Sequence, residues 1–176
     1  MLAIFFIFYF ILSIPYFSGD VKNHIVWGRS ILKEGTLGFY GRYFHDYSFP
    51  NYPPLSMFTF AGSAWLFDRT KELIMILDRI PYFPSIFVKW INFENVEVSF
   101  LKIPAILPFI LSGGVIFYFG KLLKKSDKSA LIHTASFFLN PAFFYLAVVW
   151  GQNDFSQVLF MLIAILLLFK ENFYPS

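Results

Sequence analysis

The chain has 176 residues, a formal net charge of +3 and no cysteine. Hydrophobic residues make up 57% of the sequence and charged residues 14%, whereas soluble domains average roughly 45–50% and 25%. This composition excludes an ordinary soluble domain, and the lack of cysteine excludes a disulfide framework and thiolate chemistry. The modest charge gives no indication of nucleic-acid binding. We therefore predict an all-α, polytopic membrane protein.

Four apolar segments predict membrane spans. A bilayer crossing takes about 17–25 residues. The sequence offers candidates at about residues 2–17, 98–120, 131–149 and 155–169. A further apolar run, 55–67, is too short to cross, and we expect it to lie at the interface or to re-enter. We treat residues 1–176 as a single membrane domain in which a long loop, 18–97, joins the first two spans.

The connection between the second and third spans sets the predicted orientation. Residues 121–129 hold one acidic side chain, Asp127, against four lysines, Lys121, Lys124, Lys125 and Lys128. Such an excess marks a cytoplasmic loop. This orientation places loop 18–97 and segment 150–154 together on the outer face. If 55–67 crossed the membrane instead, the lysine loop would face outward and Asp20 would be separated from Asp154.

The outer loop begins with a predicted amphipathic helix from Asp20 to Glu34. Its apolar residues recur at helical spacing, and we expect Asp20 as its N-cap and Gly35 as its C-terminal stop. Such a helix lies along a membrane surface. Glycines and prolines in residues 35–54 predict an ordered loop, and residues 68–97 predict further surface helices and turns.

Three motifs on the outer face each have two readings. Asp20 is a helix N-cap, or it is a general base whose anionic form the helix N-terminus stabilises. The run Asn-Tyr-Pro-Pro-Leu at 51–55 is a rigid turn before a helix, or part of a site. The run Trp-Gly-Gln-Asn-Asp at 150–154 is an interfacial tryptophan with a turn and a cap, or the lining of a site. Within the third span, Asn140-Pro141 predicts a kink.

Cationic side chains near the outer face offer a second set of candidates. Lys102, close to the outer end of its span, either snorkels to the interface or holds a lipid phosphate. Others that could hold a phosphate are His24, Arg29, Arg42 and His45. We expect His133, near the inner face, to be structural. No histidine pair has the spacing of metal ligands, so no metal site is predicted, although a carboxylate-bound divalent ion stays open.

In combination the motifs are more specific than they are singly. An acidic residue soon after the first span, then W-G-R-S-I-L-K-E-G, then N-Y-P-P-L, then L-N-P leading into W-G-Q-N-D, resembles the glycosyltransferase C superfamily. The sequence is similar to polytopic mannosyltransferases related to those that build glycosylphosphatidylinositol anchors. It is also similar to dolichyl-phosphate-glucose glucosyltransferases. The resemblance covers nearly the whole chain but only the N-terminal part of such an enzyme, so we expect a longer polypeptide.

The resemblance implies a function. Asp20 would be the catalytic base of an inverting transfer of a hexose, most simply mannose, from a polyprenyl-phosphate donor. The acceptor would be a hydroxyl of a glycan, a glycolipid or a protein, and membrane lipids would surround the enzyme. The matching substrate-binding positions are Tyr52, Pro53, Pro54, Trp150, Gln152 and Asp154. For the departing phosphate we expect cationic side chains, namely Lys102, His24 and Arg29.

Two other functions remain open. A transporter or flippase fragment would carry polar groups along the interior of its helix bundle. In this sequence the polar groups instead gather at the predicted outer face. A non-catalytic membrane scaffold or assembly factor fits the short length, but it does not explain why Asp20, Tyr52-Pro53-Pro54 and Asp154 cluster on one face. The lack of a targeting signal favours the plasma membrane of a prokaryote over the endoplasmic reticulum.

Overall fold

The computed structural model describes residues 2–123 and 125–173, so Met1, Lys124 and residues 174–176 lie outside it. Every regular element in the described part is helical, which confirms the all-α prediction. In chain order the elements are α1 (Leu2–Ser13), α2 (Gly19–Glu34), the 3₁₀-helix η1 (Phe39–Gly41), α3 (Pro54–Leu77), α4 (Ser85–Ile91), α5 (Val96–Leu101), α6 (Ile103–Leu122), α7 (Asp127–Phe138), α8 (Pro141–Phe144), the π-helix η2 (Tyr145–Trp150) and α9 (Asp154–Phe173).

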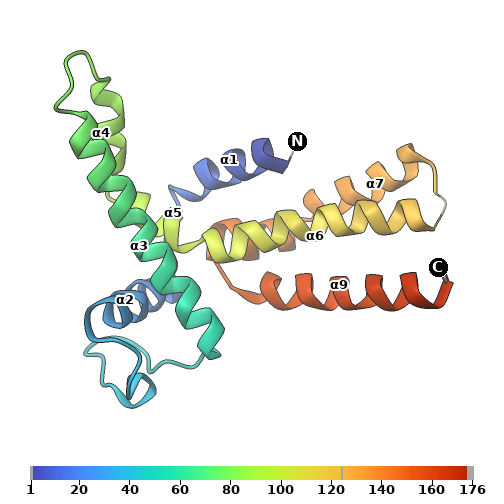
Figure 1. The fold of residues 1–176 in the computed structure, drawn as a ribbon, viewed down its shortest axis with the longest axis horizontal. Coiled ribbons are helices and arrows are strands. Elements are labelled where there is room, and N and C mark those ends of the chain that lie inside the picture. The colour runs from blue at the N-terminus through green and yellow to red at the C-terminus, as the bar shows by residue number, and fades with distance from the viewer. Residues whose placement is uncertain (1, 124, 174–176) are drawn as a thin grey trace.

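Four helical segments lie side by side and form what we call the bundle: α1, α6, the broken segment α7–α8–η2, and α9 (Figure 1). Helix α6 contacts each of the others. The connection between α6 and α7 lies at one end of the bundle, together with the C-terminal end of α9, whereas the N-terminal end of α1 lies midway along α6 (Figure 1). The segments that carry Asp20, Lys102 and Trp150 lie at the opposite end. The acidic motifs therefore lie at one end of the bundle, opposite the connection between α6 and α7, as the predicted topology requires, and their common membrane face stays a prediction.

The remaining elements, α2, the loop 35–53, α3, α4 and α5, form what we call the cap. Helix α3 packs against α2 and α5 and crosses the end of the bundle instead of running along it (Figure 1). The expectation of a short element at 55–67 was wrong in length, because α3 has 24 residues and continues through charged Asp68 and Arg69. The expectation that this segment does not cross a membrane agrees with its composition, because α3 is not among the helices that suit a crossing, and its place at an interface stays a prediction. Pro54 starts the helix at a position where its missing N–H costs nothing.

Within the described residues, α6 is the one helix whose length and composition suit a membrane crossing. The predicted span 98–120 is in fact broken at Lys102, where α5 ends and α6 begins with Pro104 in its first turn. The predicted span 131–149 is bent by 53° at Asn140-Pro141, which confirms the kink, and it would make a second crossing if both halves count as one. Helix α1 has 12 residues and is short for a crossing.

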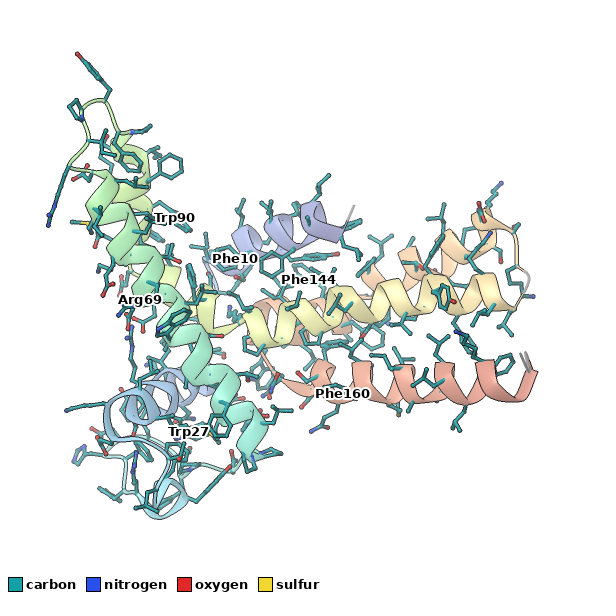
Figure 2. The ribbon with its side chains drawn as sticks, in the orientation of Figure 1. Phe10, Trp27, Arg69, Trp90, Phe144 and Phe160 are labelled. Atoms are coloured by element: carbon teal, nitrogen blue, oxygen red, sulfur yellow. The ribbon has the colours of Figure 1, made fainter. Side chains whose placement is uncertain are left out.

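Two apolar cores hold the molecule together, one in each part. The cap core centres on Trp27, Phe60 and Phe100, and the bundle core on Phe109 and Phe138. Figure 2 shows the cap core beside Trp27 and the bundle core beside Phe144. The bundle also carries large apolar side chains on its outside, among them Ile4, Ile7, Phe8, Phe160 and Met161, which are each more than half exposed. An apolar outer surface of this kind marks contact with a membrane or with another protein.

Candidate functional site

Asp20 lies in the first turn of α2, at the junction between cap and bundle. The predicted N-cap was wrong by two residues, because Ser18 holds that position and its hydroxyl accepts a hydrogen bond from the Val21 amide at 3.3 Å. Gly35 ends the helix as expected, with φ 76°. Asp20 does not cap the helix, but the positive end of the helix dipole still stabilises its half-buried anionic carboxylate. Its side chain is therefore available for contacts outside α2.

Those contacts come from the last residue of η2 and from the turn that follows it. One carboxylate oxygen of Asp20, Oδ2, accepts hydrogen bonds from the Trp150 indole N–H at 2.6 Å and from the Gln152 side-chain amide. The Tyr52 hydroxyl donates to the side-chain amide oxygen of Gln152, Oε1, at 2.5 Å. Four predicted site residues from three distant segments thus form one hydrogen-bonded chain, which we call the Asp20 network. Among the described residues nothing donates to the other oxygen of Asp20, Oδ1.

The backbone of residues 145–152 is shaped to deliver Trp150 and Gln152. The π-helix η2 is a rare element that is frequently found at functional sites. It ends at Gly151 with φ 79°, a left-handed conformation that favours glycine. The amides of Gly151 and Gln152 then both donate to the Leu146 carbonyl at 3.0 Å. The turn projects Trp150 and Gln152 toward α2 on either side of the glycine.

Tyr52 enters the network from the start of α3. The Pro53-Pro54 pair fixes the approach, since Pro53 precedes the helix in an extended conformation and Pro54 opens it. Burial raises the pKa of Tyr52 to about 12, and the nearby carboxylates Asp154 and Asp20 add to the effect. The phenol therefore stays protonated and acts as a donor. Asp154, the first residue of α9, is exposed and influences the network by its charge.

Two cavities flank the network. A polar cavity of about 590 Å³ lies between α2 and the loop 35–53; its lining includes Asp20, Lys22, Asn23, Tyr43, Asp46 and Tyr47. A more apolar cavity of about 350 Å³ lies between the start of α3 and the start of α9; its lining includes Tyr52, Leu55, Thr59, Asn153 and Phe160. The network joins the two, because Asp20 borders the first cavity and Tyr52 borders the second.

Several of these lining residues were missed by the sequence reasoning. Tyr43, Asp46 and Tyr47 lie in a loop that was assigned only as ordered. The available signal was the density of aromatic and polar side chains in residues 40–49. Asp46 adopts a left-handed φ of 64°, a conformation that is uncommon outside glycine and recurs at functional sites.

The predicted phosphate-binding cations are placed differently from what we expected. His24 is fully buried and stacks on Phe60 with 4.0 Å between ring centroids. Burial lowers its pKa to about 4, against a smaller opposing effect of Asp20, so it is neutral at pH 7. Arg29 is bound by two carboxylates, at 2.5 Å from Asp68 and 2.7 Å from Glu97. Neither carries a charge free for a phosphate.

The environment of Lys102 differs most from what we predicted, which was a place at the interface or on a lipid phosphate. Its side chain is fully buried and does not snorkel. Its ammonium group donates to the carbonyl oxygens of Ser13, Tyr16 and Val148 at 3.1, 2.7 and 3.1 Å. All three donors of the ammonium are used. Lys102 is therefore not placed to touch a ligand in either cavity.

The two other outer-face cations also have structural surroundings. Arg42 donates to the carbonyls of Glu34, Gly35 and Leu37 and so holds the loop onto the end of α2. His45 is exposed and pairs with Asp46 at 2.6 Å. His133 lies exposed on α7, remote from the network along the helix. Within residues 2–123 and 125–173, no group of three or more histidine and acidic side chains could hold a metal ion.

Comparison with known proteins identifies no relative. No protein-family model, no curated protein and no solved structure matches the chain. The case for a function therefore rests on the residues, on their geometry and on the resemblance of the motifs.

Proposed function

We propose that this protein is a polytopic membrane glycosyltransferase, or a part of one. It moves a hexose from a polyprenyl-phosphate donor to an acceptor hydroxyl, and Asp20 is the general base. The observation that carries the proposal is the Asp20 network. Asp20, Tyr52 and the pair Trp150 and Gln152 come from three segments far apart in sequence. Trp150 and Gln152 donate to the Asp20 carboxylate, and Tyr52 joins them through Gln152.

The chemistry needs one oriented carboxylate with a free oxygen. Trp150 and Gln152 hold Oδ2 of Asp20, and Oδ1 is left to accept the proton of an acceptor hydroxyl in the polar cavity. As that oxygen attacks the anomeric carbon, the bond from this carbon to the phosphate oxygen breaks. The phosphate leaves with the electron pair, still attached to its lipid, and the anomeric configuration inverts. General-base assistance of this kind contributes about 10²–10⁴-fold to a rate.

A lipid-attached leaving group also needs a cation or backbone N–H groups to stabilise its charge. Lys102, His24 and Arg29 are engaged elsewhere. Lys22 is exposed and borders the same cavity as Asp20, so we assign this role to Lys22. The more apolar cavity beside Tyr52 opens near Leu55 and Phe160, which suits the first part of a hydrocarbon chain.

We further propose that the bundle crosses the membrane four times, by α1, α6, the broken segment α7–α8–η2, and α9. The cap and the Asp20 network would then face the outside, and the lysine-rich connection at 121–129 would face the cytoplasm. The apolar outer surface of the bundle supports this arrangement. We place the protein in the plasma membrane of a prokaryote, as a multi-pass protein.

Substitution of Asp20 tests the proposal. We expect Asp20→Asn, assayed in reconstituted membranes with radiolabelled mannosyl polyprenyl phosphate and glycan or glycolipid acceptors, to lose at least about 10²-fold in transfer rate. The amide oxygen of asparagine can still accept from Trp150 and Gln152, so the fold should persist. Asp78→Asn, an exposed carboxylate at the far end of α3, is the matched control and should transfer at the wild-type rate. Wild-type turnover by Asp20→Asn would remove Asp20 as the base.

A transporter or flippase is the second candidate, and labelling separates it from a transferase. The chain has no cysteine, so Asp20→Cys and Asp154→Cys each introduce a single reactive thiol. A transferase predicts labelling from the outer side alone, whereas a transporter predicts exposure that alternates with substrate. A membrane scaffold predicts outer labelling and no transfer with any donor.

A further inference from the structure

Lys102 is a buried cation that the proposed chemistry leaves unused. Its side chain is 0% exposed, and no carboxylate among the described residues pairs with it. A buried ammonium without compensation is costly. Here the compensation comes entirely from the three backbone carbonyls, of Ser13, Tyr16 and Val148.

Those carbonyls lie where helices end. Ser13 is the last residue of α1, Tyr16 follows it by one short turn, and Val148 lies in the last turn of η2. The last carbonyls of a helix have no partner within the helix and carry the negative end of its dipole. The ammonium therefore binds carbonyls at two helix ends at once, and the Ser13 carbonyl also accepts from the Tyr16 amide at 3.3 Å. Lys102 itself occupies the break between α5 and α6, so it fixes a third element to the other two.

The two segments that Lys102 ties together lead directly into two of the three segments that build the Asp20 network. Two residues after Tyr16, the Ser18 hydroxyl donates to the Trp150 carbonyl at 2.7 Å. Two residues after Val148 comes Trp150, whose indole donates to Asp20. The aliphatic stem of Lys102 lies against Gly151, where an added Cβ would come within 2.8 Å of its Cγ. The Lys102 side chain thus contacts this turn twice, through its ammonium at the Val148 carbonyl and through its stem at Gly151.

We propose that Lys102 is a positioning residue. By holding the end of α1 and the last turn of η2 at a fixed separation, it places the donors of Trp150 and Gln152 on Oδ2 of Asp20, and it touches no substrate. The geometric part of this inference stands without the proposed function. Its consequence for catalysis rests on that function.

The test reads the hydrogen bond directly. The indole N–H of Trp150 is observed by ¹⁵N NMR of the full chain in micelles and assigned with Trp150→Phe. We expect Lys102→Met, which keeps the apolar stem and removes the ammonium, to shift this signal to the position of an indole that is free in solvent. Thr134→Val, which removes a buried hydrogen bond within α7, is the control and should leave the signal in place. A folded Lys102→Met with an unchanged Trp150 signal would overturn the proposal.

A second variant covers the case in which Lys102→Met does not fold. Gly151→Ala keeps the ammonium but forces a Cβ against the Lys102 stem in a left-handed conformation. We expect the same displacement of the Trp150 signal, and an unchanged signal again counts against the proposal. In the donor assay, displacement should lower kcat by about 10²-fold, as misplacements near 1 Å do. If the signal moves but the wild-type chain transfers no sugar, the positioning role holds and the proposed function fails.

Discussion

The cap and the bundle are held together by different kinds of contact. In the cap, charged and polar groups link the elements in addition to the apolar core. Arg29 on α2 binds carboxylates on α3 and α5, and the Trp27 indole donates to the Ser48 carbonyl at 3.0 Å. In the bundle the elements meet mainly through rings, and Phe109 alone contacts four other aromatic side chains. This contrast supports the proposal that the cap faces water and that the bundle faces lipid.

Matched deletions of one buried ring in each part should show the largest effect. Phe60 in the cap and Phe109 in the bundle are both almost completely buried. A phenylalanine-to-alanine change in a core surrounded by water costs about 3–5 kcal/mol, from lost transfer energy and from the cavity. In lipid the transfer contribution is small, because the unfolded side chain also meets hydrocarbon. We therefore expect Phe60→Ala to lower the free energy of unfolding by about 4 kcal/mol and Phe109→Ala by about half of that.

Equilibrium unfolding of the full chain in micelles, followed by circular dichroism, measures both changes. Phe58→Ala is the control for the cap, since Phe58 is more than half exposed on α3, and its effect should be small. Equal losses for Phe60→Ala and Phe109→Ala would mean that the bundle also folds as a water-excluded core. In that case the comparison between the two parts fails.

The second prediction concerns the loss of stability at low pH that arises from a histidine in the cap. His24 is buried with both ring nitrogens unpartnered, and its pKa in the folded protein is lowered from 6.5 to about 4. Between these pH values the unfolded chain binds a proton that the folded protein does not, so stability falls as the pH drops from about 6.5 through about 4. The full loss is about 3 kcal/mol.

His24→Phe keeps a ring to stack on Phe60 and removes the titrating group. Unfolding at pH 7 and pH 4 should therefore differ by about 3 kcal/mol less in the variant than in the wild type. The stacking distance of 4.0 Å leaves room for a ring of similar size. An identical pH dependence in both proteins would show that the acid response arises outside the cap core.

Much of this architecture could be predicted from the sequence, because the strongest signals are local. Residue spacing predicted α2 and its end at Gly35, and proline geometry predicted the kink at Asn140-Pro141. Charge predicted that the acidic motifs lie at one end. The length of α3 was missed because its charged second half resembles loop by composition. In three dimensions Arg29 pairs with Asp68 there, and the partners lie 39 positions apart.

The site shows the same division between local and distant information. Asp20, Tyr52, Trp150 and Gln152 could be named from motifs. The environment of a cation could not be predicted, because Lys102 and Arg29 are both basic residues near the outer face. In the structure the Lys102 ammonium donates to backbone carbonyls, whereas the Arg29 guanidinium pairs with carboxylates. Only the folded chain decides which cations already have polar partners or lose their charge on burial, and for this reason the proposed function assigns the phosphate to Lys22 instead of Lys102, His24 or Arg29.

The smallest expected effect tests how closely the cap is packed. Gly28 on α2 faces α3 so tightly that an added Cβ would lie 2.8 Å from the backbone carbon and oxygen of Phe60. Because backbone atoms cannot move aside, Gly28→Ala should separate the two helices and cost about 1–3 kcal/mol. Gly62 on α3 has nothing within 4 Å of the same position, so Gly62→Ala should stabilise the helix by about 0.5–1 kcal/mol. Unfolding of both variants in the same micelles measures the pair. A neutral Gly28→Ala would mean that α2 and α3 pack more loosely than their contact implies, and that the polar links around Arg29, more than close packing, hold the cap together.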